Sequence, residues 1–337
     1  MLRTVLLLVI IAVIVASALI FLRAAAFNAS VSSAGFPSTA LLGPLNGSDR
    51  INVLMVGYGG EDHDGAYLAD SIQILSVDPA TDTTTTVPIP RDLWIEGIGS
   101  FSQNGRVNEV FAAGYVSAGA AGDESLDAAA SLVADVLSEV TGMPIDHWIS
   151  IDFSGFREMV DAVGGVTIDN PVAFDYTTNE ALHQAGVWEE GGFTAGETTL
   201  DGEGALVYAR ARYTSVMSES NDFARSIRQA RILSALRSKV GSGGIGSLVP
   251  GLRLMDAMED RVRTDLSAID LFLLSSHLSS DRRIELSEDV VLTATTNTEG
   301  QYILVPTGWI GAGDYGRLQV YLADELGRLS TSRTDAP

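Results

Sequence analysis

The sequence contains no cysteine and a single lysine, Lys239, among its 337 residues. Without cysteine, the chain can form neither disulfides nor thiolate metal sites, and it has no thiol nucleophile. Basic residues are scarce overall, since 21 lysines and arginines face 43 acidic residues and the formal net charge is -22. This charge argues against nucleic acid as a partner. It also makes clustered arginines informative, because an acidic protein that binds an anion has to concentrate positive charge locally.

One long hydrophobic run lies at the amino terminus. Residues 5–22 are uncharged, and Arg3 and Arg23 flank them. A run of this length can cross a hydrocarbon core of ~30 Å. The alternative is a cleaved signal peptide, but the apolar core of such peptides is usually only about 7–15 residues long. We therefore predict that residues 1–23 form a single-pass transmembrane signal anchor in the cell membrane, with the rest of the chain extracytoplasmic.

The remaining chain divides by composition. Residues 24–49 are rich in alanine, serine, glycine and proline, which suits a flexible linker. Residues 50–320 can bury a substantial core and are assigned to one extracytoplasmic domain, although the length also allows two. Residues 321–337 would hold the end of a C-terminal helix and a tail.

Strand-like and helix-like segments alternate through the domain. INVLMVGYGG, SIQILSVDP and TTTTVPIP are typical of buried strands, with the first two paired either parallel or antiparallel. LDAAASLVADVLSEVTG has apolar residues at helical spacing and stops at Gly142. Further helices are expected at 226–240, near 266–278 and near 317–326. The alternation predicts a layered α/β domain with a central mixed sheet flanked by helices.

The loop between the first two strands is rich in glycine and acid. Residues 57–72 read GYGGEDHDGAYLADSI, in which Asp62, Asp64 and Asp70 are hard oxygen ligands suited to Mg²⁺. A solvated acidic loop is the alternative interpretation of the segment alone.

Arginines recur at three further places. Arg91 follows two prolines at a strand end, where it either reaches a ligand or pairs with Asp92 on the surface. Arg210 and Arg212 alternate with alanines, so in an extended segment both would point to one face and could hold an anion between them. A solvent-facing basic strand is the alternative.

The third place is a predicted helix. Asp222, Arg225, Arg228 and Gln229 fall at i, i+3, i+6 and i+7, which makes one stripe with Asp222 near the amino end. An ordinary salt-bridged helix face would have the same spacing. The four histidines are scattered through the chain, and no nucleophilic triad is visible.

Taken in order, these segments resemble the LytR-CpsA-Psr family over residues 52–239, with weaker similarity to residue 308. The family's first series of motifs has its counterparts in LADSI, SVDP, IPRD and GRVNEVFAAG. The second series corresponds to DHWISIDFSGFREMVDAVGGVTIDNP, FTAGETTLDGEGALVYARARY and DFARSIRQARIL. Several blocks in the family's order are far harder to produce by chance than one glycine motif.

The resemblance implies a phosphotransferase that moves a glycopolymer from a polyprenyl pyrophosphate carrier onto peptidoglycan in cell wall assembly. The alternatives are a regulatory protein that only binds polyprenyl phosphate, and a polyprenyl pyrophosphate phosphatase. The residues implied to bind the lipid phosphate are Arg91, Arg210, Arg212, Arg225, Arg228 and Gln229.

The resemblance also assigns catalytic roles. Arg91, Arg210 and Arg212 would act on the phosphates, and Asp222 would position or deprotonate the acceptor hydroxyl, or else orient one of the neighbouring arginines. Asp70 occupies a magnesium-ligand position. The family often has an aspartate where this chain has Gly59 and an arginine where it has Leu68, so Asp62 or Asp64 could complete the metal site.

Overall fold

The structure is a computed structural model of the chain. It describes residues 21–35, 40–41, 44–46, 49–61, 63–188, 190–241, 248–276, 281–288 and 290–331. The predicted anchor therefore lies almost entirely outside the described residues. Among the helices that are described, none combines the length and the apolar character needed to span a bilayer.

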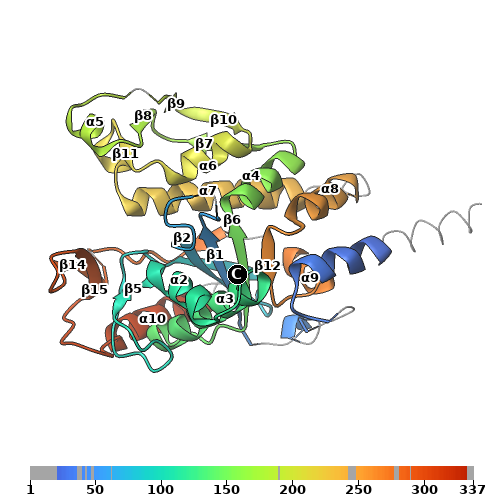
Figure 1. The fold of residues 1–337 in the computed structure, drawn as a ribbon, viewed down its shortest axis with the longest axis horizontal. Helices are drawn as coiled ribbons and strands as arrows, with labels where there is room; N and C mark the ends of the chain where they lie inside the picture. The colour runs from blue at the N-terminus through green and yellow to red at the C-terminus, as the bar shows by residue number, and fades with distance from the viewer. Residues whose placement is uncertain are drawn as a thin grey trace, which may run out of the picture.

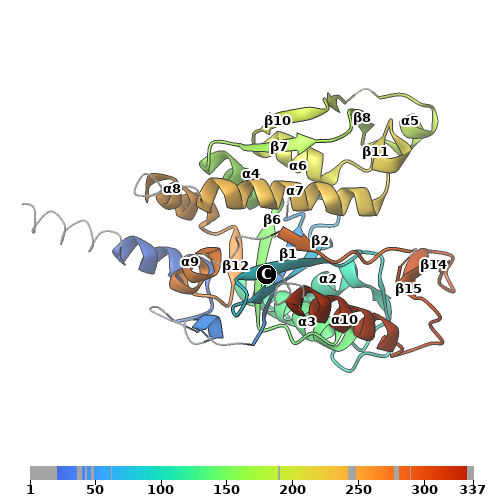
Figure 2. The same cartoon turned by 180° about the vertical axis from the view of Figure 1, so that it is seen from behind.

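A six-stranded sheet runs through the middle of the molecule (Figures 1 and 2). Its strands, in spatial order, are β12 (Val262–Thr264), β6 (His147–Asp152), β1 (Ile51–Tyr58), β2 (Ala69–Asp78), β3 (Thr83–Pro88) and β13 (Asp281–Arg283). β2 is antiparallel to both β1 and β3, whereas β6 is parallel to β1 and β13 is parallel to β3. The predicted mixed sheet is confirmed, and the first two strands pair antiparallel.

Three helices cover one face of the sheet, below it in Figure 1. They are α2 (Val107–Ser117), α3 (Asp123–Thr141) and α10 (Gly316–Thr331). α3 ends where the sequence predicts, because Gly142 adopts a left-handed conformation with φ 68° and its N–H bonds the Ser138 carbonyl. Apolar residues of α2, α3 and α10 pack with alternate residues of β1 and β2, such as Leu54 and Ile74, into the largest core cluster.

The opposite face carries α4 (Phe153–Ala162), α6 (Gly202–Arg210) and α7 (Asp222–Gly241). Above these helices lie two small antiparallel sheets, whose strands are β7 (Val166–Asn170) with β10 (Gly196–Leu200), and β11 (Tyr213–Thr214) with β8 (Phe174–Thr177) and β9 (Gly192–Phe193). A second core cluster, which includes Ile168, Tyr208 and Ile232, joins these strands to α6 and α7. The upper layer is therefore a packed unit of its own over the central sheet.

The remaining elements lie beside the layers described above. They are η1 (Pro44–Asn46), β4 (Trp94–Ile95), β5 (Gly105–Arg106), α5 (Glu180–Gln184), η2 (Met217–Glu219), α8 (Leu248–Met258), α9 (Ala268–Ser276), β14 (Leu292–Thr296) and β15 (Tyr302–Pro306). β4 pairs with β5, and β14 forms an antiparallel hairpin with β15.

The segment predicted as a flexible linker is partly structured. Residues 21–31 are helical, Phe27 and Val31 are buried beside Ala268 of α9, and the buried Leu41 donates its N–H to Asp270 at 2.9 Å. Small residues predominate in this stretch, but its few large apolar side chains find a surface on which to pack. The expectation of a flexible linker is therefore wrong for these residues.

Candidate active site

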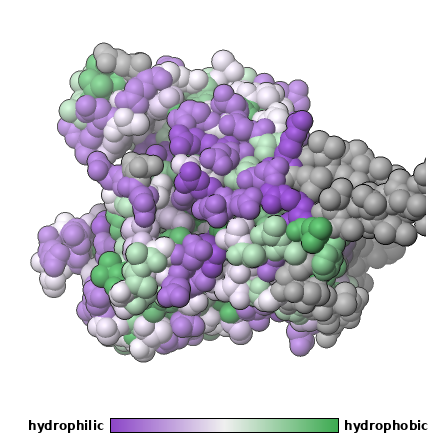
Figure 3. All heavy atoms as spheres, turned by 45° about the vertical axis from the view of Figure 1, so that its right-hand side comes forward, coloured by the Kyte–Doolittle hydropathy of each residue, from purple (hydrophilic) through white to green (hydrophobic). Residues whose placement is uncertain are grey.

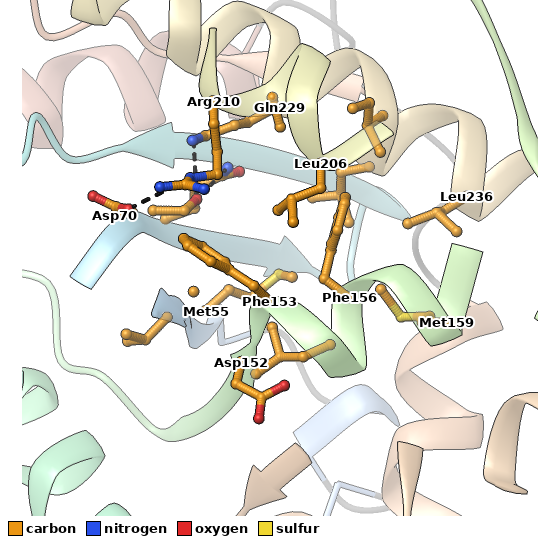
Figure 4. Close-up of a pocket in the computed structure, with 18 of the residues that line it drawn as sticks. Met55, Asp70, Asp152, Phe153, Phe156, Met159, Leu206, Arg210, Gln229 and Leu236 are labelled. Atoms are coloured by element: carbon orange, nitrogen blue, oxygen red, sulfur yellow. Dashed lines mark hydrogen bonds and ion pairs between the residues drawn. The ribbon is translucent and has the colours of Figure 1, made fainter. Parts of the chain in front are cut away.

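An apolar cavity lies between the central sheet and the upper helices (Figure 4). Its walls come from β1, β2 and β6 on one side and from α4, α6 and α7 on the other. The apolar side chains that line it include Met55, Ile149, Ile151, Phe153, Phe156, Met159, Leu206, Ile232, Leu233 and Leu236. Figure 4 shows Asp70, Arg210 and Gln229 gathered at one end, with Met159 and Leu236 at the other.

A polar cleft continues from that charged end. Asp70, Arg210 and Gln229 line both the cavity and the cleft, so the two are joined at these side chains. The cleft has a volume of about 510 Å³, against about 110 Å³ for the cavity by the same measure. The space-filling view in Figure 3 shows the molecule hollowed between the upper layer and the sheet. The predicted site residues that line the cleft are Asp64, Asp70, Arg91, Arg210, Arg212, Arg225 and Gln229.

Asp70 reaches the cleft through an irregularity in β2. Gly57 is paired with Ser71 and Tyr58 with Ala69, so Asp70 is an extra residue on its strand, as in a β-bulge. Ala69 joins the core below the sheet, whereas Asp70 and Ser71 both line the cavity above it. Regular alternation would have turned Asp70 away from Ser71.

The Asp70 carboxylate lies between two arginines. Arg91 Nη1 is 3.4 Å from Asp70 Oδ1, and Arg210 Nε is 3.8 Å from Asp70 Oδ2. Arg91 Nε also lies 3.6 Å from Asp92, so the two residues do pair, but Asp92 is buried and the pair is not on the surface. These contacts hold two guanidinium groups at one carboxylate, where a phosphate could engage both.

Arg210 contacts His63 and Phe153 in addition to Asp70. Its Nη2 donates to His63 Nε2 at 2.8 Å, and its Cζ lies 4.2 Å from the centre of the Phe153 ring. The ring nitrogen that accepts this bond must be unprotonated, which is consistent with His63 Nδ1 donating to the Asp64 carbonyl at 2.6 Å. Burial lowers the pKa of Arg210, and the charge of Asp70 opposes that shift. His63 was not predicted as a site residue, because the four histidines are scattered along the sequence.

Arg210 and Arg212 meet at the cleft for a different reason from the one predicted. The segment is helical, because α6 ends at Arg210 and Ala211 leaves the helix with φ -50° and ψ 118°. The strand-like alternation was therefore the wrong interpretation. Both side chains still line the cleft, since the chain turns out of the helix between them. Arg212 also lies beside Tyr213, with its Cζ 5.6 Å from the ring centre.

α7 supplies Arg225 and Gln229 to the cleft, as the helical spacing indicated. Gln229 Oε1 accepts a hydrogen bond from Ser71 at 3.0 Å, which ties α7 to β2. The amino end of α7 is capped by Asn221, whose Oδ1 accepts from the Ala224 N–H at 2.8 Å. Asp222 is the first residue of the helix, and its side chain lies outside the described part of the structure.

Arg228 does not reach the cleft. Its side chain is fully buried and donates to the Tyr208, Ala211 and Glu219 carbonyls and, at 2.7 Å, to the Glu219 carboxylate. The prediction that Arg228 binds lipid phosphate is wrong in this geometry, because every contact it makes is internal. Arg228 instead fixes the end of α6, from which Arg210 and Arg212 emerge.

Asp70, the predicted magnesium ligand, lies where the cavity and the cleft meet. Among the described residues, no three acidic or histidine side chains come together to form a metal cage. Asp64 lines the cleft, and Asp62 lies outside the described residues. A side chain at Gly59 would begin 2.9 Å from His63 Cβ, so His63 fills the space that the family's aspartate would need there.

Comparison with known proteins agrees with this architecture. A curated relative from Enterococcus faecalis, named polyisoprenyl-teichoic acid–peptidoglycan teichoic acid transferase TagU, is 29% identical over 67% of this chain and 65% of its own. The protein of the same name from Bacillus subtilis is 26% identical over 71% of this chain and 67% of its own. The matched part of this chain thus spans about two thirds of these relatives.

Solved structures share the fold. The crystal structure of B. subtilis TagU matches 84% of this chain and 96% of its own, with a TM-score of 0.55 and 24% identity. A structure described as TagT bound to LIIa-WTA matches 89% of this chain and 97% of its own, with a TM-score of 0.57 and 20% identity. The model of the LytR_cpsA_psr family matches residues 23–307, and the chain belongs to that family.

Proposed function

We propose that the protein is a phosphotransferase that attaches a glycopolymer, carried on a polyprenyl pyrophosphate, to peptidoglycan. The observation that carries the proposal is the apolar cavity that opens, at Asp70, Arg210 and Gln229, into an arginine-lined cleft. A ligand that fits both parts has a long hydrocarbon chain and an anionic head group. The names of the relatives, which act on polyisoprenyl-linked teichoic acid and peptidoglycan, support the same substrate class.

The proposed reaction exchanges one P–O bond for another. A hydroxyl oxygen of the acceptor attacks the phosphorus next to the glycan, and the bond from that phosphorus to the bridging oxygen breaks. Polyprenyl monophosphate leaves with the bond's electron pair. Charge grows on the phosphoryl oxygens during this step, and Arg91, Arg210 and Arg212 would stabilise it with fixed, planar donors.

The hydroxyl proton needs an acceptor during the attack. Asp222 precedes Arg225 by three residues at the start of α7, so helical spacing puts both on one side of the helix. We assign proton transfer to Asp222, as the sequence predicts; orientation of a neighbouring arginine is the alternative role.

Magnesium is part of the proposal. Mg²⁺ is commonly held by one or two carboxylates, with substrate phosphates and water completing its shell. The carboxylate of Asp70 at the junction of cavity and cleft fits this pattern, with Asp64 and Glu190 as the other acidic residues lining the cleft. When bound, the ion would neutralise charge on the diphosphate.

The transferase and its two alternatives differ in what they release. We expect the full-length protein, given a polyprenyl pyrophosphate-linked glycan and Mg²⁺, to release polyprenyl phosphate only when peptidoglycan is added, with glycan appearing on the peptidoglycan. A phosphatase would release lipid phosphate without the acceptor. A regulatory protein would bind the lipid and release nothing. Either of these results would refute the transferase assignment.

The same assay tests the metal site through Asp70→Asn. This change keeps the side-chain shape and removes a full charge, so transfer should fall steeply while the thermal melting curve is retained. Normal magnesium-dependent turnover in the variant would rule out Asp70 as the ligand. Asp169→Asn is a suitable control, because Asp169 lies on the exposed side of β7, away from the cleft.

We further propose that residues 1–23 anchor the protein in the cell membrane with the domain outside, as peptidoglycan transfer requires. A protease added to intact protoplasts should then digest the region after Arg23. A domain protected from the protease until the cells are lysed would place it inside, and would exclude access to peptidoglycan. Immunoblots with an antibody to the domain, before and after lysis, measure how much of the domain is digested.

A further inference from the structure

A second groove lies on the β14–β15 hairpin, at the end of the molecule beside β5 (Figure 1). Its volume, about 510 Å³, equals that of the arginine-lined cleft. Two tryptophans, Trp94 and Trp309, form part of its wall. The polar residues lining it are Glu96, Asn104, Thr293, Thr295, Thr296, Asn297 and Thr298.

The strand register explains how these residues come to share a face. In the hairpin, Thr293 is opposite Val305 and Thr295 is opposite Ile303, and directly opposite residues lie on the same side of a sheet. Leu304 is bridged in parallel to Leu93, and both are in the core. Their neighbours Val305 and Trp94 consequently face the other way, toward the groove.

The chemistry of the groove suits a saccharide. An indole presents a flat apolar face that can cover the C–H face of a sugar ring, while hydroxyl and amide groups pair with sugar hydroxyls. Trp94 is already fixed, since its Nε1 donates to Glu96 at 2.9 Å. Trp309 Nε1 is covered and has no hydrogen-bond partner among the described residues. A ligand hydroxyl that reached it would remove the free-energy cost of leaving a buried donor unpaired.

The charges of the groove and the cleft differ. Among the described residues that line the groove, none is basic and one, Glu96, is acidic. The cleft is lined by Arg91, Arg210, Arg212 and Arg225. A phosphate-rich chain would therefore favour the cleft, and an uncharged sugar chain would suit the groove.

Residues of the groove and of the cleft lie close together along the backbone. Arg91 and Trp94 are three residues apart, which limits their Cα separation to about 10 Å. The Leu304 N–H donates to the Asp92 carbonyl at 2.9 Å, so the hairpin is bonded directly to the residue that follows Arg91. A short sugar chain seated on Trp94 could reach the phosphates held at Arg91.

From these observations we infer that the groove between Trp94 and Trp309 binds the uncharged saccharide strand of the acceptor and presents its hydroxyl to the cleft. This inference rests on the proposed transferase function, because only a transferase has an acceptor. The binding of a saccharide strand to the groove can be tested without any donor.

The test is a titration of the full-length protein in detergent with N-acetylated chitin fragments, which are uncharged sugar chains without the lactyl carboxylate of peptidoglycan, followed by tryptophan fluorescence and calorimetry. Trp309→Ala should weaken binding about tenfold. Thr295→Arg, which removes no packing and places a long side chain in the groove, should weaken it similarly. Ile310→Ala is the control, because Ile310 is 92% exposed beside Trp309 and does not line the groove.

Unchanged affinity in both groove variants would overturn the inference, as would an equal loss in the control. In the transfer assay, Trp309→Ala should raise KM for the acceptor. A rise in KM for the lipid-linked donor, with KM for the acceptor unchanged, would show that the groove binds the donor's glycan instead, and would overturn the inference. If wild-type protein binds the fragments but transfers nothing, the proposed function fails and the groove assignment stands.

Discussion

Replacing Arg210 by lysine should weaken binding of a polyprenyl pyrophosphate about tenfold to a hundredfold, nearly as much as replacing it by alanine. Lysine keeps the positive charge but loses the planar fork that can bond two phosphate oxygens at once. It also loses the contact with the Phe153 ring at 4.2 Å. The loss of charge-assisted hydrogen bonds costs about 1.5–3 kcal/mol, which corresponds to that range of affinity. Titration with the lipid in detergent gives the measurement.

Stability should change little in Arg210→Lys. Asp70 keeps its contact with Arg91 at 3.4 Å, and the lysine keeps a positive charge beside Asp70. Arg157→Lys is the matched control, since Arg157 pairs with Glu203 at 3.0 Å on the exposed surface of α4 and does not line the cleft. Unchanged lipid affinity in Arg210→Lys and Arg210→Ala would disprove the phosphate clamp.

Replacing Arg228 by methionine should lower the free energy of unfolding by about 3–5 kcal/mol, the cost of breaking a buried ion pair by removing one partner. Typical domains are stable by about 5–15 kcal/mol, so the effect would be severe. Arg228 is fully buried, and the Glu219 carboxylate 2.7 Å away would be left without its charge partner. Burial lowers the pKa of Arg228, and the bond to Glu219 opposes this shift. Denaturant unfolding of the two proteins provides the comparison.

A second substitution separates the structural role from a ligand-binding one. Adding Glu219→Leu to Arg228→Met removes the stranded carboxylate and should restore part of the lost stability. Arg157→Met, at an exposed ion pair, should cost no more than about 1 kcal/mol. If Arg228→Met melted like wild type but bound lipid poorly, the interpretation from sequence would have been right and the internal role assigned here would be wrong.

Arg228 shows where helical spacing stops being informative. In a helix of 3.6 residues per turn, Arg228 and Gln229 point about 100° apart, so one can line a cleft while the other enters the core. The motif spacing identifies the helix and the approximate stripe. It contains nothing about the position of Glu219, Tyr208 and Ala211, which lie on other elements and decide that Arg228 is internal.

The strands and α3 were predictable because local signals agreed with the packing. Buried runs of β-branched residues predicted β1 to β3, and Gly142 predicted the end of α3. Contacts between distant segments were not predictable in this way. His63 meets Arg210 across 147 positions of sequence, and the hairpin groove depends on a bridge between Leu93 and Leu304. No spacing rule within one segment reports such contacts.

The extra residue in β2 affects how far the loop before it can change in length without moving the site. Asp70 is positioned by the strand residues on both sides of it, through the pairs of Ser71 with Gly57 and Ala69 with Tyr58. The ten residues between the paired strands, 59–68, lie outside this ladder. Insertions or deletions there would change the loop and leave Asp70 in register. Alignments of this region are therefore best anchored on the bulge rather than counted forward from the glycines.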